Sequence, residues 1–280
     1  MPQTVVYIDD KKVDYRKAAV SVFDYTLHCG IGLFESILAV DDRLILLDEH
    51  LDRMEMGIKR LGLDNLRYNR KRIKSTLRRA ARNHPDKVKK TKVLLTQGYS
   101  QMWPGSKPKP KSIVIVTGHR LQFKKQKLML SPMRITTANP LQGVKTLNYM
   151  TEWMSQRQAV ESGYDQGIII NQRGHISETG SANIFMVKNG QMFTPPVSSG
   201  ALPGIMRSEI LRLAKLHGIP CHEKSLTPKK LSSADEIFTT SSFKLVWPVV
   251  ELKLNGRTHK FPPGPTARFL FDELKAEFTG

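Results

Sequence analysis

Hydrophobic and polar residues follow two different periods in the first part of the chain. Short apolar segments at 5–8 (VVYI) and within 35–47 (ESILAV and LILL, around an Asp-Asp turn) predict strands, the latter two joined as a hairpin. Between 48 and 63 the apolar residues instead recur every three or four positions, which predicts a helix ended by Gly62. A basic helix within 67–92 and strands at 92–97 and 112–118 are expected to follow.

The second part of the chain mixes the same two periods in a less regular order. A strand at 127–136 precedes a helix at 148–163, and short strands then surround further helices at 205–218 and 266–278. Since strands and helices do not alternate as regular βαβ units, we expect an α+β fold. The polar, basic segment 119–126 is interpreted as a linker between an N-terminal lobe (1–118) and a larger C-terminal lobe (127–280).

Composition is that of an ordinary globular protein. Of the 280 residues 40% are hydrophobic and 25% are charged, and no apolar segment is long enough for a membrane span. The start of the chain lacks the pattern of a signal peptide, and the only cysteines, Cys29 and Cys221, lie far apart. We therefore expect a cytoplasmic protein with no membrane partner.

The charge is unusual, with 44 basic against 25 acidic residues and a net charge of +19. The densest basic segment, Arg67–Lys92, raises the alternative of a nucleic-acid-binding protein. However, that segment contains almost none of the aromatic residues on which single-stranded bases stack. A solvated helix face is the preferred interpretation, and nucleic acid is not expected as a partner.

Several common site motifs are absent. The CGIGLFE segment lacks the third glycine of a dinucleotide fingerprint, and the chain contains no phosphate-binding GxxxxGK[ST] loop. It also lacks HExxH and paired CxxC motifs, so no metal is expected.

Three features of the second half suggest a different chemistry. Lys145 precedes a helix, and Glu178 lies between a strand and a run of small residues. Two segments suit an anion: LPGIMRSEI, where a helix begins, and FTTSSF, where hydroxyls follow a strand. A lysine for a Schiff base, a carboxylate for a pyridine nitrogen and a phosphate cradle are the groups that pyridoxal 5'-phosphate requires.

With these segments in this order, the chain resembles the class IV aminotransferases, the fold-type IV group of pyridoxal-phosphate enzymes. The resemblance covers nearly the whole chain through GLFES, KTLNY, GYDQGIIINQRGHISETGSANIF, LPGIMR and ADEIFTTSS. The group includes branched-chain aminotransferases, D-amino acid aminotransferases and 4-amino-4-deoxychorismate lyases. It implies a two-lobed α/β fold like that of D-amino acid aminotransferase, with the cofactor between the lobes, and a homodimer.

The resemblance also implies roles for individual residues. Lys145 would be the catalytic Schiff-base lysine, Glu178 would pair with the pyridine nitrogen, and Arg53 would bind the phosphate. The further cofactor-binding residues would be Tyr149, Leu202, Gly204, Ile205, Met206, Ser241 and Ser242. The substrate pocket would contain Phe34, Tyr99, Met102 and Trp103.

Departures from the family pattern leave several functions open. Met206 replaces a frequent threonine, and GIMR and GYS (98–100) resemble lyase members, whereas FES (34–36) and Tyr149 resemble transaminases. Met102 stands where D-amino acid aminotransferases have an arginine. An aminotransferase that uses L-amino acids, in particular branched-chain ones, and 2-oxo acids is placed first. Aminodeoxychorismate lyase is second and D-amino acid aminotransferase third, and a basic nucleic-acid-binding protein on an inactive scaffold is the alternative from another class.

Overall fold

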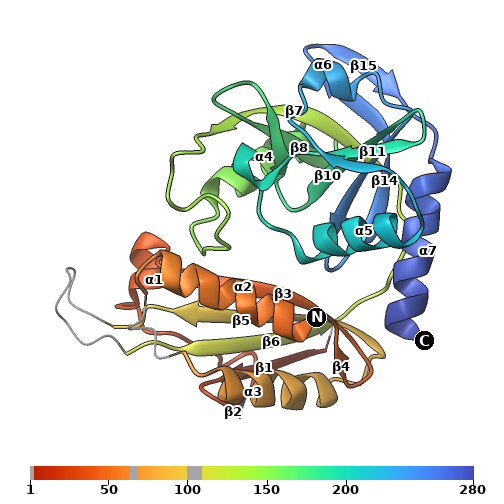
Figure 1. Cartoon of the computed structure of the whole chain (residues 1–280). Coiled ribbons are helices and arrows are strands. Elements are labelled where there is room, and N and C mark those ends of the chain that lie inside the picture. The colour runs from red at the N-terminus through yellow and green to blue at the C-terminus, as the bar shows by residue number, and fades with distance from the viewer. Residues whose placement is uncertain (1–2, 64–67, 100–108) are drawn as a thin grey trace. The chain divides into compact units, whose positions relative to one another are not determined.

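The computed structural model describes residues 3–63, 68–99 and 109–280, which form two compact units. The first unit comprises the chain up to Arg120 together with Val144–Tyr149, and the second comprises Leu121–Gly143 and Met150–Gly280 (Figure 1). The predicted α+β class is confirmed, because each unit combines a mainly antiparallel or mixed sheet with helices.

The first unit is built on a six-stranded antiparallel sheet in the order β2-β1-β6-β5-β3-β4. Its strands are β1 (Thr4–Ile8), β2 (Lys11–Val13), β3 (Gly32–Val40), β4 (Arg43–Leu44), β5 (Val88–Thr96) and β6 (Ser112–Gly118). The long strands β3 and β5 pair along their whole length, from Gly32 opposite Thr96 to Val40 opposite Val88. This pairing gives β3 a rigid central position.

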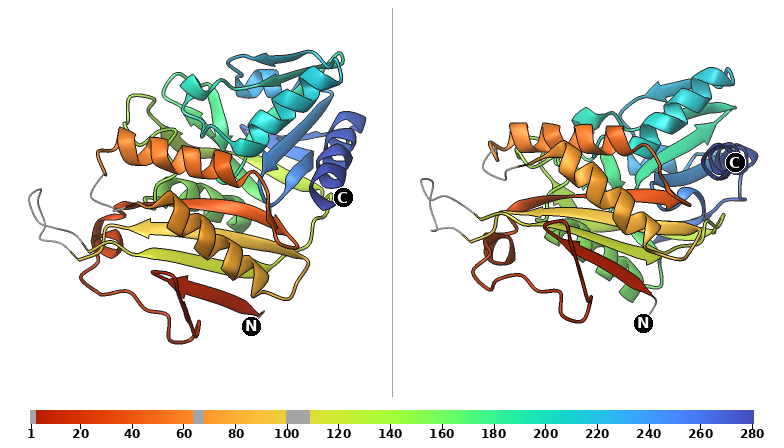
Figure 2. Two further views of the ribbon diagram at one scale, coloured as in Figure 1. Left: turned by 60° about the horizontal axis from the view of Figure 1, so that its bottom comes forward. Right: turned by 90° about the horizontal axis from the view of Figure 1, so that it is seen from below.

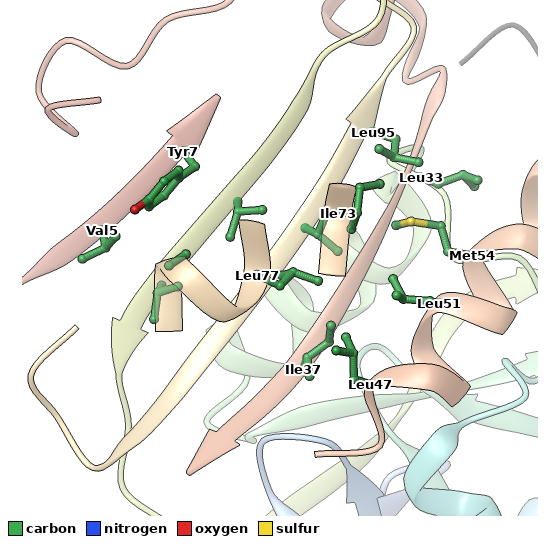
Figure 3. Close-up of a cluster of buried hydrophobic side chains, with 14 of the residues drawn as sticks. Val5, Tyr7, Leu33, Ile37, Leu47, Leu51, Met54, Ile73, Leu77 and Leu95 are labelled. Atoms are coloured by element: carbon green, nitrogen blue, oxygen red, sulfur yellow. The ribbon is translucent and has the colours of Figure 1, made fainter. Parts of the chain in front are cut away.

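Two amphipathic helices cover one side of this sheet, α2 (Leu47–Arg60) and α3 (Arg70–Arg82) (Figure 2). Figure 3 shows side chains of both helices packed against strand residues such as Leu33 and Ile37. Burying these apolar side chains removes them from water, which is the main force that holds the unit together. A short helix, α1 (Tyr25–Cys29), precedes β3.

The basic segment forms a helix with a sharp division between faces. Ile73, Thr76, Leu77, Ala80 and Ala81 are buried, and apart from Ser75 every other residue of α3 is basic. Part of this charge is neutralised, because Arg70 pairs with Asp48, Asp52 and Glu55 of α2.

The second unit is built on a mixed sheet in the order β12-β11-β10-β13-β14-β7-β8-β9, with β15 paired to β14. Its strands are β7 (Gln126–Ile135), β8 (Gln166–Asn171), β9 (Ile176–Thr179), β10 (Asn183–Lys188), β11 (Gln191–Thr194), β12 (Cys221–Glu223), β13 (Glu236–Ser241), β14 (Leu245–Leu254) and β15 (Arg257–Lys260). Strand β8 is buried along its whole length, which explains its uninterrupted apolar sequence GIII.

Helices pack against this sheet within the second unit. They are α4 (Met150–Glu161), α5 (Ile205–Leu216), α6 (Pro228–Leu231) and α7 (Pro265–Thr279), with a 3₁₀ turn at Val197–Ser199. Helix α4 packs on β7 and β8, whereas α5 and α7 both pack on β13. None of the helices among the described residues is long and apolar enough to cross a membrane.

Several predicted boundaries differ from the structure. The strand expected at 92–97 begins at Val88, inside the segment in which the basic helix was expected, because α3 already ends at Arg82. The strand expected to run to residue 47 ends at Leu44, because Leu46 has a left-handed conformation (φ 52°) and α2 begins at the next residue. The short segment Val144–Tyr149 belongs to the first unit, whereas sequence analysis assigned it to the C-terminal lobe. Hydrogen bonds to β3, described below, account for this difference.

Candidate active site

Lys145 lies on Val144–Tyr149, which runs beside the start of β3. The Phe34 N–H donates to the Lys145 carbonyl oxygen (3.0 Å), and the Leu147 N–H donates to the Gly32 carbonyl oxygen (2.9 Å). Gly32 leaves no room for a side chain here, since a Cβ would lie 2.5 Å from the Leu95 carbonyl oxygen and 2.7 Å from Leu147 Cδ1. The backbone of Lys145 is therefore fixed by strand-like pairing.

Two aromatic rings of the first unit lie beside the Lys145 side chain. Its Nζ is 4.3 Å from the ring centroid of Phe34 and 6.0 Å from that of Tyr149. The two rings pack edge to face with centroids 5.7 Å apart. A cation is attracted to the faces of such rings, so the half-buried ammonium group has a defined position.

A buried group of three polar side chains links β3 to α2. Glu35 is completely buried, and its carboxylate accepts hydrogen bonds from Arg53 Nε (2.8 Å) and Arg53 Nη2 (2.6 Å). His50 Nδ1 lies 2.7 Å from Glu35 Oε2. Arg53 and His50 are one helical turn apart on α2 and both are buried, so one carboxylate holds two residues of the same helix face.

The charges in this group are compensated. Burial alone would raise the pKa of Glu35, but the charge of Arg53 and the hydrogen bonds from Arg53 and His50 outweigh it and lower the pKa to about 2. Burial also lowers the pKa of His50, despite the opposing hydrogen bond to Glu35. At neutral pH the group therefore contains an ion pair of Arg53 with Glu35 and an uncharged imidazole.

Glu178 is held in the second unit by a second set of hydrogen bonds. Its Oε1 accepts from the Leu202 N–H (3.0 Å) and its Oε2 accepts from Asn183 Nδ2 (3.3 Å). Asn183 Nδ2 also donates to the Leu202 carbonyl oxygen (3.0 Å). Strand β10 and the segment before α5 thus fix the carboxylate.

Helix α5 begins at the residues predicted for an anion. Gly204 is its N-cap, without a side-chain cap, and Ile205 and Met206 are its first two residues. The first N–H groups of a helix have no partner within the helix and carry the positive end of its dipole. A Cβ on Gly204 would lie 1.9 Å from Asn183 Oδ1, so glycine is required next to the side chain that supports Glu178.

The predicted hydroxyl groups lie at the end of β13. Ser241 is the last residue of the strand and Ser242 follows it, and both are half-buried. The neighbouring Thr240 hydroxyl donates to the Leu245 carbonyl oxygen (2.7 Å), which closes the turn into β14.

Buried side chains connect the strands that carry these groups. Gln166 Oε1 accepts from Thr179 Oγ1 (3.0 Å), next to Glu178, and Gln166 Nε2 donates to Gln126 Oε1 (2.7 Å). Gln126 Nε2 in turn donates to Thr239 Oγ1 (2.6 Å) on β13. Since all these amides and hydroxyls are buried and bonded, the network connects β9 to β13 through β8 and β7.

The predicted site residues thus form two groups, one in each unit. The first unit contains Lys145, Phe34, Tyr149 and Arg53, and the second contains Glu178, Leu202, Gly204, Ile205, Met206, Ser241 and Ser242. Tyr99 belongs to the first unit and pairs by isolated bridges with Asp24 and Lys109. Met102 and Trp103, predicted for the substrate pocket, lie outside the described residues.

Sequence reasoning did not assign roles to Glu35, His50 or Asn183. Glu35 does have a detectable signal, because alternation along β3 places it on the same face as buried Leu33 and Ile37. A carboxylate at such a position requires a buried partner.

The chain is similar in sequence to a family of known proteins. The sequence profile described as "Amino-transferase class IV" matches residues 32–252. A protein of Methanocaldococcus jannaschii named "Putative branched-chain-amino-acid aminotransferase" is 30% identical over 254 residues, covering 88% of this chain and 87% of the relative.

Two solved structures are similar over almost the whole chain. The branched-chain amino acid aminotransferase of Escherichia coli has a TM-score of 0.88 at 25% identity, covering 99% of this chain and 95% of that one. A Legionella pneumophila protein described as "Putative 4-amino-4-deoxychorismate lyase" has a TM-score of 0.84 at 25% identity, covering 94% and 97%. The chain belongs to the class IV aminotransferase family, and it is an enzyme of that class.

Proposed function

We propose that the protein is a pyridoxal-phosphate-dependent aminotransferase that moves the amino group of an L-amino acid with a branched apolar side chain to a 2-oxo acid. The observation that carries this proposal is the placement of Lys145, fixed by β3 and half-buried against Phe34 and Tyr149. A lysine kept for solubility would require neither the backbone pairing nor the aromatic contacts.

The residues present fit pyridoxal 5'-phosphate. Arg53 is a buried cation, α5 begins without a side-chain cap, and Glu178 is an oriented carboxylate. Arg53, the N–H groups of Ile205 and Met206, and the hydroxyls of Ser241 and Ser242 would hold the phosphate. Glu178 would keep the pyridine nitrogen protonated, and Leu202 and Tyr149 would contact the ring and its phenolic oxygen.

When bound, the cofactor supplies an aldehyde and a ring that withdraws electrons from the substrate α-carbon. Lys145 would hold the aldehyde in the resting enzyme and, once the substrate amine replaces it, would move the α-proton as a general base and acid. Phe34 and Tyr149 would restrict where its Nζ can lie.

The preference for branched side chains is supported by the names of the relatives and by the apolar character of Phe34 beside Lys145. Aminodeoxychorismate lyase remains the second candidate function. Met206 in place of a threonine at the start of α5 and the similar Legionella structure favour it.

The active enzyme is proposed to be a homodimer, as the family resemblance implies. Met150, Trp153, Met154 and Val160 are exposed on one side of α4. These positions lie on one side of the helix, together with the exposed ion pair of Arg157 and Glu161, and a second copy of the chain would cover this side.

Absorption spectra of the purified protein loaded with cofactor test the proposal. Addition of L-leucine without a 2-oxo acid should remove the visible band and produce the band of pyridoxamine phosphate. An unchanged spectrum with L-leucine, L-isoleucine and L-valine contradicts branched-chain transamination. Release of pyruvate from aminodeoxychorismate would identify the lyase instead.

A further inference from the structure

Glu35 occupies a position where a carboxylate is costly. It lies between Leu33 and Ile37 on the core face of β3 and has no exposed surface. Transfer of an ionised carboxylate into such surroundings is strongly unfavourable unless other groups compensate its charge. Arg53 compensates the charge of Glu35 and His50 adds a hydrogen bond, so the geometry of these two contacts indicates the role of Glu35.

The contact between Glu35 and Arg53 uses one particular edge of the guanidinium group. Oε1 accepts from Nε and Oε2 accepts from Nη2, at 2.8 and 2.6 Å. A guanidinium has five N–H donors in one plane, and this paired contact uses the edge that carries Nε. The opposite end, with both N–H groups of Nη1 and the second N–H of Nη2, is not used by Glu35.

His50 fixes the carboxylate from another direction. An ionised carboxylate can only accept hydrogen bonds, so His50 Nδ1 must donate to Oε2 across the 2.7 Å contact. Oε2 therefore accepts from both Arg53 and His50, and the carboxylate cannot rotate without breaking several bonds. The plane of the Arg53 guanidinium is thereby determined before any ligand binds.

We infer that Glu35, supported by His50, is a positioning residue that turns the Nη1 end of Arg53 toward the phosphate of the cofactor. This inference rests on the proposed function, in which Arg53 binds that phosphate. The alternative role for Glu35 is that of a counterion, which neutralises Arg53 without directing it. The two roles predict opposite effects on phosphate affinity, because loss of a nearby negative charge alone strengthens the attraction between Arg53 and a phosphate.

Binding of two aldehydes to the cofactor-free protein separates the two roles. Pyridoxal and pyridoxal phosphate differ only in the phosphate. The dissociation constant of pyridoxal divided by that of pyridoxal phosphate therefore reports how well the phosphate is held. Glu35→Gln preserves the volume but removes the charge and one acceptor for Arg53. Loss of orientation should lower the ratio about tenfold, through weaker binding of pyridoxal phosphate with pyridoxal unaffected.

His50→Ala provides a second variant that leaves no buried charge without its partner. It removes one hydrogen bond to the carboxylate and should lower the same ratio about threefold. This variant keeps the inference testable if Glu35→Gln does not fold.

Glu236→Gln is the matched control. Glu236 is a buried carboxylate in the second unit, and it accepts hydrogen bonds from Thr266 and Ala267 at the start of α7. This variant should lower the melting temperature while the ratio stays within about twofold of the wild-type value. Such a result shows that lost stability alone does not change the ratio.

The possible outcomes test the role of Glu35 separately from the proposed pyridoxal-phosphate-dependent function. If the wild-type protein binds neither aldehyde, the proposed function fails. If wild type binds pyridoxal phosphate far better than pyridoxal but the ratio is unchanged or higher in Glu35→Gln, Glu35 is only a counterion and the inference is overturned. A lower ratio in both site variants, with an unchanged control, supports it.

Discussion

At the scale of single residues, the buried ionisable side chains allow the most specific predictions about stability and activity. Glu35, His50 and Arg53 are all less than a tenth exposed, yet they contain a carboxylate, an imidazole and a guanidinium. Removal of one partner leaves another charge buried alone, which typically costs about 3–5 kcal/mol. Residue-scale predictions therefore concern this group and Lys145.

The stability of the protein should fall on acidification because of Glu35. Its pKa is about 2 in the folded chain and 4.5 without the fold, so its stabilising contribution is complete above pH 4.5 and disappears as pH falls toward 2. The difference corresponds to roughly 3 kcal/mol. His50 acts in the same direction below pH 6.5, because its folded pKa is also lowered and the unfolded chain binds the proton first.

Urea unfolding of wild type and Glu35→Gln at several pH values measures this effect. The stability difference between the two should shrink between pH 5 and pH 2.5. A stability difference that does not depend on pH would show that the ion pair of Glu35 with Arg53 does not cause the loss of stability on acidification.

Lys145→Ala should remove the visible absorption of bound cofactor that depends on the lysine amine. Loss of a general base and acid should reduce kcat by about 10²–10⁴-fold. The comparison is Lys125→Ala, which removes an exposed lysine of the second unit. Steady-state rates and spectra of both variants check this, and a Lys145→Ala enzyme with normal turnover would contradict the assigned role.

At the scale of elements, hydrophobic periodicity predicted where helices and strands lie better than it predicted the residues at which they begin and end. The predicted strand at 112–118 coincides with β6, since its apolar run lies between a loop and a polar segment. Helix α2 begins earlier than its apolar spacing indicated, because the left-handed Leu46 turns the chain directly from β4 into the helix. Short elements such as α1 and β12 depend on contacts with distant residues and have no period of their own to detect.

The start of α5 provides a prediction at this scale. Gly204→Ala causes no backbone strain, as φ is −70°, but the new Cβ would displace the Asn183 side chain from Glu178. The stability should fall by about 1–3 kcal/mol, and cofactor affinity should fall with it.

Denaturant unfolding and cofactor titration measure these two effects. Lys215→Arg, at an exposed position near the end of the same helix, is the control and should change neither. Normal cofactor affinity in Gly204→Ala would mean that Asn183 does not support Glu178.

At the scale of the whole molecule, association of two chains is the main prediction. Trp153 is 52% exposed on the solvent side of α4, with Arg157 5.5 Å from its ring centroid. A buried tryptophan at an interface often contributes about 2 kcal/mol or more, so Trp153→Glu should weaken dimerisation at least about thirtyfold.

Sedimentation velocity over a range of concentrations tests this. Leu216→Glu replaces a still more exposed apolar residue (68%) on α5 and should leave association unchanged. Equal effects of both substitutions, or a wild-type protein that is monomeric throughout, would exclude α4 as the interface.

The candidate site residues could be proposed from the sequence because they occur in ordered motifs. Lys145, Glu178 and the start of α5 each have a recognisable local context. The residues that orient these groups could not be predicted in the same way. Asn183 and His50 act through hydrogen bonds to residues of other elements, and no local pattern specifies such contacts.

The path of the chain has a consequence for biosynthesis. The backbone passes from the first unit to the second after Arg120, returns for Val144–Tyr149, and leaves again. During translation the sheet of the first unit is synthesised well before the strand-like segment that pairs with β3. The segment that carries Lys145 therefore joins a structure that can already have formed, and it is the last part of its own unit to leave the ribosome.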